Sequence, residues 1–110
     1  RNVVYLVGIY DAPPDSVHSQ TGFERGSVGV FKTIQELEQS TLGNLTYVGE
    51  WHSHPPGARS APSSDDKVLL RWIGDILADV EAPATMLIFG EDGCRVVLRQ
   101  DDSEHEALLS

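Results

Sequence analysis

An apolar stripe between residues 65 and 80 constrains the fold of this chain more than any other feature. Leu69, Leu70, Ile73, Leu77 and Val80 recur at the spacing of one helix face, which predicts an amphipathic helix over residues 65–80 that must bury this face. Runs rich in β-branched and aromatic residues stand on both sides of it, and such runs are typical of strands. The sequence therefore predicts an α/β (α+β) fold in which a mixed β-sheet is flanked by helices.

Turn and cap residues delimit the other expected elements. A capping box at residues 33–36 predicts a helix that starts there and closes at Gly43. The sequence Glu-Asp-Gly at residues 91–93 supplies the left-handed residue of a tight turn and predicts a hairpin. Strands are expected at residues 3–9, 45–51, 86–89 and 94–98, and the acidic, polar tail from Gln100 is expected to fray.

Length, charge and cysteine content exclude several classes of protein. No apolar run approaches the ~20 residues that a membrane helix needs. The formal net charge of −9 argues against nucleic-acid binding, which favours a basic face. Cys94 is the single cysteine, which excludes an internal disulfide and a multi-cysteine zinc cluster and favours a cytoplasmic location. Residues 1–110 suit a single domain, and because a strand-like run begins almost at Arg1, the N-terminal portion of that domain is expected to be missing.

Two histidines mark the strongest candidate site. His52 and His54 lie at the end of an expected strand, and residues two apart on a strand share one face, so both can hold one cation. A catalytic zinc site takes three protein ligands and leaves one position open for the water that the metal activates. Asp65 and Asp66 open the following helix, where the helix dipole favours a carboxylate, and either can be the third ligand. Each feature alone is common on protein surfaces, but their combination with a Pro/Gly-rich loop favours a metal site.

These residues resemble the signature of the JAMM metallopeptidases, also called MPN-plus or prokaryotic JAB proteins. They read Gly-Glu-Trp-His-Ser-His-Pro over residues 49–55 and Pro-Ser-Ser-Asp-Asp over residues 62–66. The family signature is His-x-His, a short loop and Ser-x-x-Asp, with a glutamate well upstream. The resemblance covers roughly residues 1–98, its specific motif is confined to residues 49–66, and it implies a JAB/MPN-like fold.

The resemblance implies a zinc ion held by His52, His54 and Asp66, with Ser63 helping to hold the transition-state oxyanion. The family's usual loop length would place the serine at Pro62, which has no hydroxyl, so the loop is inferred to be one residue longer here. Asp66 also heads the apolar stripe of the helix, which points it inward. Asp65 remains the alternative third ligand.

The family's general base is a glutamate on an element before the first expected strand, so the resemblance places it upstream of Arg1. Glu50 shares a strand face with His52 and is the alternative within the chain, although its position suits support of a ligand better than proton transfer. The remaining glutamates near the motif are expected in a loop or on a solvated helix: Glu24, Glu36 and Glu38.

The resemblance implies a zinc-dependent metallopeptidase that hydrolyses peptide or isopeptide bonds in conjugates or precursors of ubiquitin-like proteins, entering C-terminal tail first. One alternative is a protein-binding scaffold, because some relatives keep the fold and lose the catalytic residues; the retained histidines and aspartate argue against it. Another is a RadC-like domain, which carries a similar His-x-His-Pro and is associated with DNA repair. The acidic composition counts against direct DNA contact. The oligomeric state stays open.

Overall fold

The computed structural model describes residues 4–10, 17–18, 23–24, 29–80 and 82–110. The chain forms two compact units, one of Tyr5–Tyr47 and one of Val48–Ser110 with Val4. Among the described residues, no helix has the length and apolar character needed to cross a bilayer. The second unit holds the residues of the candidate site.

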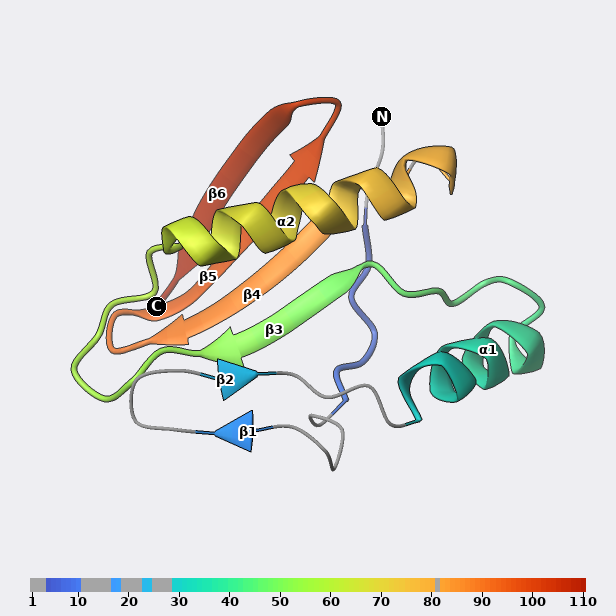
Figure 1. Ribbon diagram of the computed structural model, residues 1–110, viewed down its shortest axis with the longest axis horizontal. Coiled ribbons are helices and arrows are strands. Elements are labelled where there is room, and N and C mark those ends of the chain that lie inside the picture. Colours follow the sequence, from blue (N-terminus) through green and yellow to red (C-terminus); the bar gives the residue numbers. More distant parts are fainter. Residues whose placement is uncertain (1–3, 11–16, 19–22, 25–28, 81) are drawn as a thin grey trace. The chain divides into compact units, whose positions relative to one another are not determined.

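A mixed four-stranded sheet forms the centre of the second unit (Figure 1). Its strands follow the order β3-β4-β5-β6. The first two are parallel and the other neighbours are antiparallel, which confirms the mixed sheet and the α+β class. The strands are β3 (Gly49–Ser53), β4 (Ala84–Gly90), β5 (Gly93–Gln100) and β6 (Ser103–Leu109).

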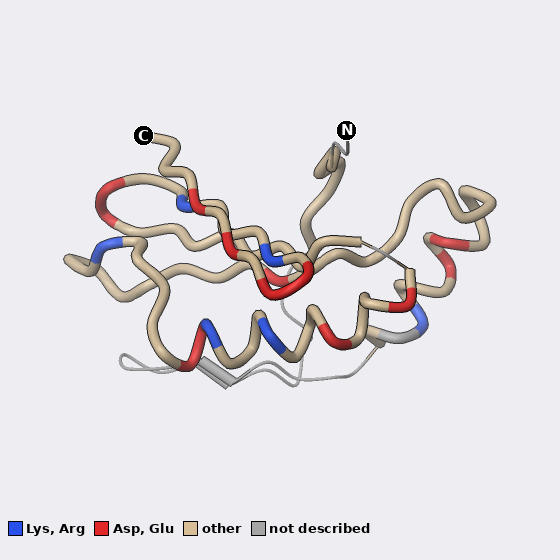
Figure 2. The backbone as a smooth tube through the Cα atoms, turned by 90° about the horizontal axis from the view of Figure 1, so that it is seen from above, with Lys and Arg blue, Asp and Glu red and all other residues tan. Residues whose placement is uncertain are grey.

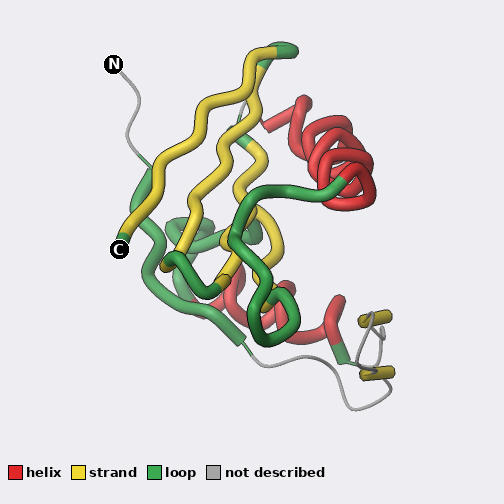
Figure 3. Tube along the Cα trace, turned by 90° about the vertical axis from the view of Figure 1, so that its left-hand side faces the viewer, coloured by secondary structure: helices red, strands yellow, loops and turns green. Residues whose placement is uncertain are grey.

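The helix α2 (Ser64–Leu77) lies across one face of this sheet, packed on β4 and β5 (Figures 1 and 3). Leu70, Ile73 and Leu77 of the apolar stripe are buried as expected, while Leu69 is half-buried. Val80 is 65% exposed, because the helix gives way to a short 3₁₀ turn, Ala78–Val80. Helix and sheet approach closely where Gly74 faces Ala84, since a Cβ on the glycine would lie 3.9 Å from the alanine Cβ. The core is made of Leu70, Ile73, Leu77, Ala84, Met86, Ile88 and Val97.

The connection from β3 through α2 to β4 positions the site. Two parallel neighbouring strands need a crossover, and here that crossover is the helix. The chain therefore leaves the carboxyl end of β3, passes through residues 54–62 and enters α2 at its N-terminus. The strand end that carries His52 and the helix start that carries Asp66 are consequently brought to the same end of the sheet.

The hairpin is confirmed, whereas the prediction of a fraying tail is wrong. Gly90 and Gly93 pair across the β4–β5 turn, and Gly93 has the positive φ of 126° that the turn needs. The tail instead forms β6, which pairs along β5 after a turn at Asp101 and Asp102. Both aspartates have positive φ, 52° and 66°, the backbone of a tight hairpin turn.

Arginines on β5 help to hold β6 in place. Arg99 lies 3.3 Å from Glu104 and 3.2 Å from Asp102, and Arg95 lies 3.4 Å from Glu106. The polar character of the tail thus matches the charges of the strand beside it. Figure 2 shows acidic positions along both the β5–β6 hairpin and α2.

The Tyr5–Tyr47 unit contains the helix α1 (Val30–Ser40) and the two-residue strands β1 (Val17–His18) and β2 (Phe23–Glu24), which pair antiparallel. The predicted capping box is wrong, because the helix begins before it. Gly29 is the N-cap and Thr33 lies in the first turn, where its N–H donates to the Gly29 carbonyl at 2.9 Å. The helix ends at Ser40, and the turn closes when the Gly43 N–H donates to Glu38 O at 2.8 Å.

The strand expected over residues 3–9 is also wrong for its described part. Residues 4–10 have no strand pairing, and Tyr5 is 80% exposed. A run of β-branched and aromatic residues favours an extended backbone, but it becomes a strand only when a neighbouring strand accepts its hydrogen bonds. The strand expected over residues 45–51 is confirmed in type, although it begins at Gly49 and extends to Ser53.

Candidate metal centre

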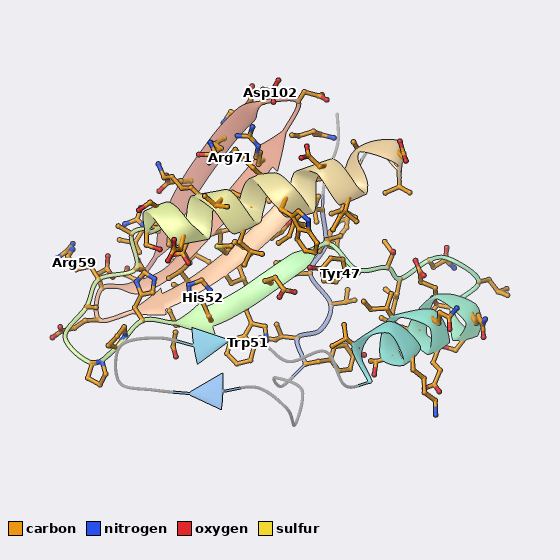
Figure 4. All side chains as sticks on the ribbon, in the orientation of Figure 1. Tyr47, Trp51, His52, Arg59, Arg71 and Asp102 are labelled. Atoms are coloured by element: carbon orange, nitrogen blue, oxygen red, sulfur yellow. The ribbon has the colours of Figure 1, made fainter. Side chains whose placement is uncertain are left out.

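The end of β3 presents His52 and His54 on one face. The His54 N–H donates to the Phe89 carbonyl at 2.8 Å, so the backbone stays in register with β4 just beyond the last residue of the strand. The two imidazole rings are therefore neighbours, with centroids 5.3 Å apart. Figure 4 shows His52 on β3 beside the start of α2. The expectation that His52 and His54, two residues apart on the strand, share one face is confirmed.

Asp66 reaches both histidines with its two carboxylate oxygens. Oδ1 lies 3.0 Å from Nε2 of His52, and Oδ2 lies 3.1 Å from Nε2 of His54. The three side chains retain only 20%, 16% and 12% exposure for His52, His54 and Asp66. Asp65, the alternative third ligand, is exposed and lies outside this group.

Asp66 is held by the capping box that starts α2. Its backbone N–H donates to Oγ of Ser63 at 3.1 Å, and its Oδ2 accepts the Ser63 N–H at 2.8 Å. This reciprocal pair satisfies two N–H groups that a helix start would otherwise leave without partners. Ser63 therefore sits directly beside the histidines' carboxylate partner, and its hydroxyl hydrogen can still be donated elsewhere.

The surroundings of Asp66 keep it ionised. Burial by itself would raise the pKa of this carboxyl. Hydrogen bonds from the His52 ring and the Ser63 N–H, the charge of His52 and a hydrogen bond from His54 outweigh burial and hold the pKa well below its usual range. The centre thus contains a carboxylate that remains negative at any physiological pH, as a metal ligand must.

One backbone carbonyl sets the role of each nitrogen in His54. Nδ1 lies 2.7 Å from the carbonyl oxygen of Arg59, which can only accept, so Nδ1 carries the hydrogen. In the neutral ring Nε2 is then a bare lone pair, and it faces Oδ2 of Asp66 at 3.1 Å. Two facing acceptors require a proton or a cation between them.

The donor set suits zinc. One ligand atom from each of His52, His54 and Asp66 lies within 4.8 Å of the others, so the group can hold a metal ion. Two imidazoles and one carboxylate are the set that catalytic zinc sites use, with a further position left open. The second nitrogen of His54 is already hydrogen-bonded to a backbone carbonyl, which is the usual support of a zinc-bound histidine.

Glu50 shares the sheet face of His52, as expected from its position two residues earlier. It pairs with Met86 across the parallel ladder while His52 pairs with Ile88, and all four project toward the α2 side. Glu36 and Glu38 lie on α1 and Glu24 lies in β2, all within the Tyr5–Tyr47 unit.

Sequence reasoning missed Arg59. The residue contributes its main-chain carbonyl to His54, while its side chain is 76% exposed. Any residue can supply a carbonyl, so no side-chain signal marks this position. Only the fold of the 54–62 loop could have revealed it.

Comparisons with known proteins show which proteins the chain is similar to. The family model for prokaryotic homologs of the JAB domain matches residues 4–102. A protein from Escherichia coli (strain TW11681), named "CD-NTase/cGAS isopeptidase", is 34% identical over 85 residues, which cover 77% of this chain and 51% of that protein. A protein of the same name from Enterobacter hormaechei subsp. hoffmannii (strain UCI 50) is 41% identical over 54 residues, which cover 49% of this chain and 28% of that protein. The chain therefore spans about half the length of the first relative and less of the second.

Proposed function

The chain belongs to the family of prokaryotic JAB-domain homologs, and on that premise we propose that it is a zinc-dependent isopeptidase. The substrate class is a protein conjugate in which a C-terminal carboxyl group is joined to an amine through an isopeptide bond. The relatives named CD-NTase/cGAS isopeptidase support the bond type. A ubiquitin-like protein as the conjugated partner, and a cytoplasmic location, are the finer parts of the proposal.

The arrangement of His54 carries the proposal. Its Nδ1 hydrogen is committed to Arg59, and its Nε2 faces the carboxylate of Asp66 beside the Nε2 of His52. Two imidazole nitrogens that converge on a carboxylate need protons or a cation between them, and two imidazoles with one carboxylate are a ligand set that catalytic zinc sites use.

In this function His52, His54 and Asp66 hold the zinc ion. When bound, zinc supplies Lewis-acid polarisation of a carbonyl and lowers the pKa of water. Ser63 lies on the rim of the site, where its hydroxyl can donate to the oxygen of the scissile carbonyl as charge develops there. The general base is not assigned among these residues, with Glu50 as the alternative on the same sheet face.

The test measures bound zinc and cleavage in the same samples. Wild-type protein, in a form that spans the full length of the relatives, is incubated with a ubiquitin-like protein joined to a lysine side chain, and zinc is quantified by elemental analysis. The expected result is one zinc per chain and release of the two partners, both lost in His52→Ala. Asp65→Ala is the matched control, because this carboxylate lies beside Asp66 but outside the group.

Two outcomes would contradict the proposal in different ways. Protein that retains no zinc even after zinc is added would remove the metal centre. Zinc-loaded protein that binds the conjugate without cleaving it, in a form that spans the full length of the relatives, would favour a scaffold instead.

A further inference from the structure

The loop between β3 and α2 is tied to the β4–β5 turn by backbone and side-chain hydrogen bonds. The Glu91 N–H donates to the Ala58 carbonyl at 2.8 Å. The Ser60 N–H donates to Oδ1 of Asp92 at 2.7 Å. Figure 4 places Arg59 in the same loop, between these two contacts in the chain. The turn therefore holds the segment that follows the two histidines.

Packing at Gly90 shows how closely the turn and the loop approach. A Cβ on Gly90 would lie 2.4 Å from the Ser60 nitrogen and 2.5 Å from the Arg59 carbonyl carbon. No side chain fits there without displacing the loop. The Arg59–Ser60 peptide group thus lies directly against the backbone of the turn.

Neighbouring groups hold the Asp92 carboxylate in one orientation. Its side chain is 9% exposed, and its Oδ2 lies 3.6 Å from Arg95 and 3.7 Å from Arg59. Arg95 is in turn 3.4 Å from Glu106 on β6. Two cations and the Ser60 N–H therefore orient a carboxylate that has little contact with water.

One peptide group connects Asp92 to His54. The carbonyl of Arg59 and the N–H of Ser60 are the two ends of the same peptide bond, which is planar, so the direction of one end sets the direction of the other. Asp92 accepts from the N–H end at 2.7 Å, and Nδ1 of His54 donates to the carbonyl end at 2.7 Å. The peptide group is held between these two side chains.

We infer that Asp92 is a positioning residue, which fixes the His54 ring through the Arg59–Ser60 peptide group. The ring orientation follows from the contacts alone, while its consequence for zinc rests on the proposed function. The carboxylate is not one of the three candidate ligands. It acts by aiming a carbonyl at Nδ1, which leaves Nε2 directed at Asp66.

The first experiment compares zinc affinity in chelator competition for wild type, Asp92→Ala and Asp92→Asn. Asparagine keeps the Oδ1 acceptor for the Ser60 N–H, whereas alanine removes it. We expect Asp92→Ala to weaken zinc binding roughly 10–100-fold and Asp92→Asn to restore most of the affinity. A loss of the same size in both variants would contradict positioning through this hydrogen bond.

Asp102→Gly is the matched control. Asp102 is the corresponding acidic residue of the β5–β6 turn, it pairs with Arg99 at 3.2 Å, and its φ of 66° suits glycine. It makes no contact with the loop among the contacts described. Its zinc affinity should equal that of wild type, and an equal loss here would mean that any disturbed turn weakens the site.

The second experiment needs no metal. Solvent exchange of the His54 Nδ1 hydrogen is measured by NMR in zinc-free protein. Exchange should be slow in wild type and Asp92→Asn, and faster by on the order of tenfold in Asp92→Ala, because the carbonyl acceptor is no longer held. Gly90→Ala should give the same increase, since its Cβ displaces the same peptide group.

The two experiments separate failure of this inference from failure of the proposed function. If wild type binds no zinc but the exchange rates change as expected, the metal proposal fails and the positioning role stands. If wild type binds zinc while Asp92→Ala and Gly90→Ala alter neither affinity nor exchange, the positioning role is wrong and the zinc site stands.

Discussion

Ser63 and Asp66 are joined twice, by the Ser63 N–H to Oδ2 at 2.8 Å and by the Asp66 N–H to Oγ at 3.1 Å. The same Oδ2 also meets Nε2 of His54 at 3.1 Å. The first turn of α2 and the candidate metal centre therefore share one carboxylate. Substitution of Asp66 therefore changes both the helix start and the metal centre.

The two adjacent aspartates should differ sharply. Asp66→Ala is expected to reduce retained zinc below about a tenth of an equivalent, because it removes a ligand that converges with both histidines. Asp65→Ala should leave most of the zinc, since this side chain is exposed at the same helix start. Elemental analysis after dialysis makes the comparison, and the reverse ranking would show that Asp65 is the ligand.

Acid should lower the free energy of unfolding of the zinc-free protein through its effect on Asp66. Its pKa is lowered in the folded state from the ordinary value of 3.8, so the unfolded chain takes up a proton first as the pH falls. The carboxylate's contribution to the free energy of unfolding is therefore complete above 3.8 and is lost progressively below it. Urea unfolding of zinc-free wild type and Asp66→Asn, from neutral pH to about pH 3, should give a stability difference that shrinks with acid. A constant difference would argue against the lowered pKa.

Substitution of Ser63 should lower turnover without lowering zinc binding. Replacing its hydroxyl removes a donor to the developing oxyanion, for which a loss of about 10²–10³ in turnover is typical. Ser63→Gly is the preferred variant, because glycine is a tolerable N-cap and costs only a few tenths of a kcal/mol, roughly, compared with about 0.5–2 kcal/mol for alanine. Zinc content should stay at the wild-type level. Ser64→Ala, inside the helix, is the control, and similar turnover in all three proteins would leave Ser63 as a cap alone.

Glu50→Gln tests whether β3 supplies the general base. We expect zinc content to be unchanged and cleavage to fall less than about 10²-fold, because Glu50 shares the sheet face of His52, a position that suits support of a ligand better than proton transfer. Removal of a positioned base costs about 10²–10⁴ in rate. A loss of that size at full zinc occupancy would instead identify Glu50 as the base.

The grouping of His52, His54 and Asp66 was predictable from sequence because its signals are local. Asp66 heads the stripe that α2 buries, and the strand period of two brings His52 and His54 to one face. The hairpin was predictable for the same reason, because Gly93 marks the β4–β5 turn. Each inference required only the residues within one element and its ends.

The parts that sequence did not reveal depend on neighbouring strands rather than on the residues of one element. The β5–β6 turn uses two aspartates at positive φ instead of the glycine that usually marks such a turn. The sequence of β6 is polar because its acidic side chains pair with Arg95 and Arg99 on β5. In the same way, residues 4–10 have the composition of a strand, but strand pairing is decided by neighbours and not by composition.

The position of β6 at the end of the sheet also affects solubility. An outermost strand presents backbone N–H and C=O groups to which another chain can add, and charged side chains oppose such pairing. Here Glu106 is exposed on β6, beside the apolar Leu108 and Leu109, which are 41% and 59% exposed. High salt screens these charges. Salt therefore favours association of chains edge to edge, so turbidity should rise with salt at protein concentrations that remain clear at low ionic strength.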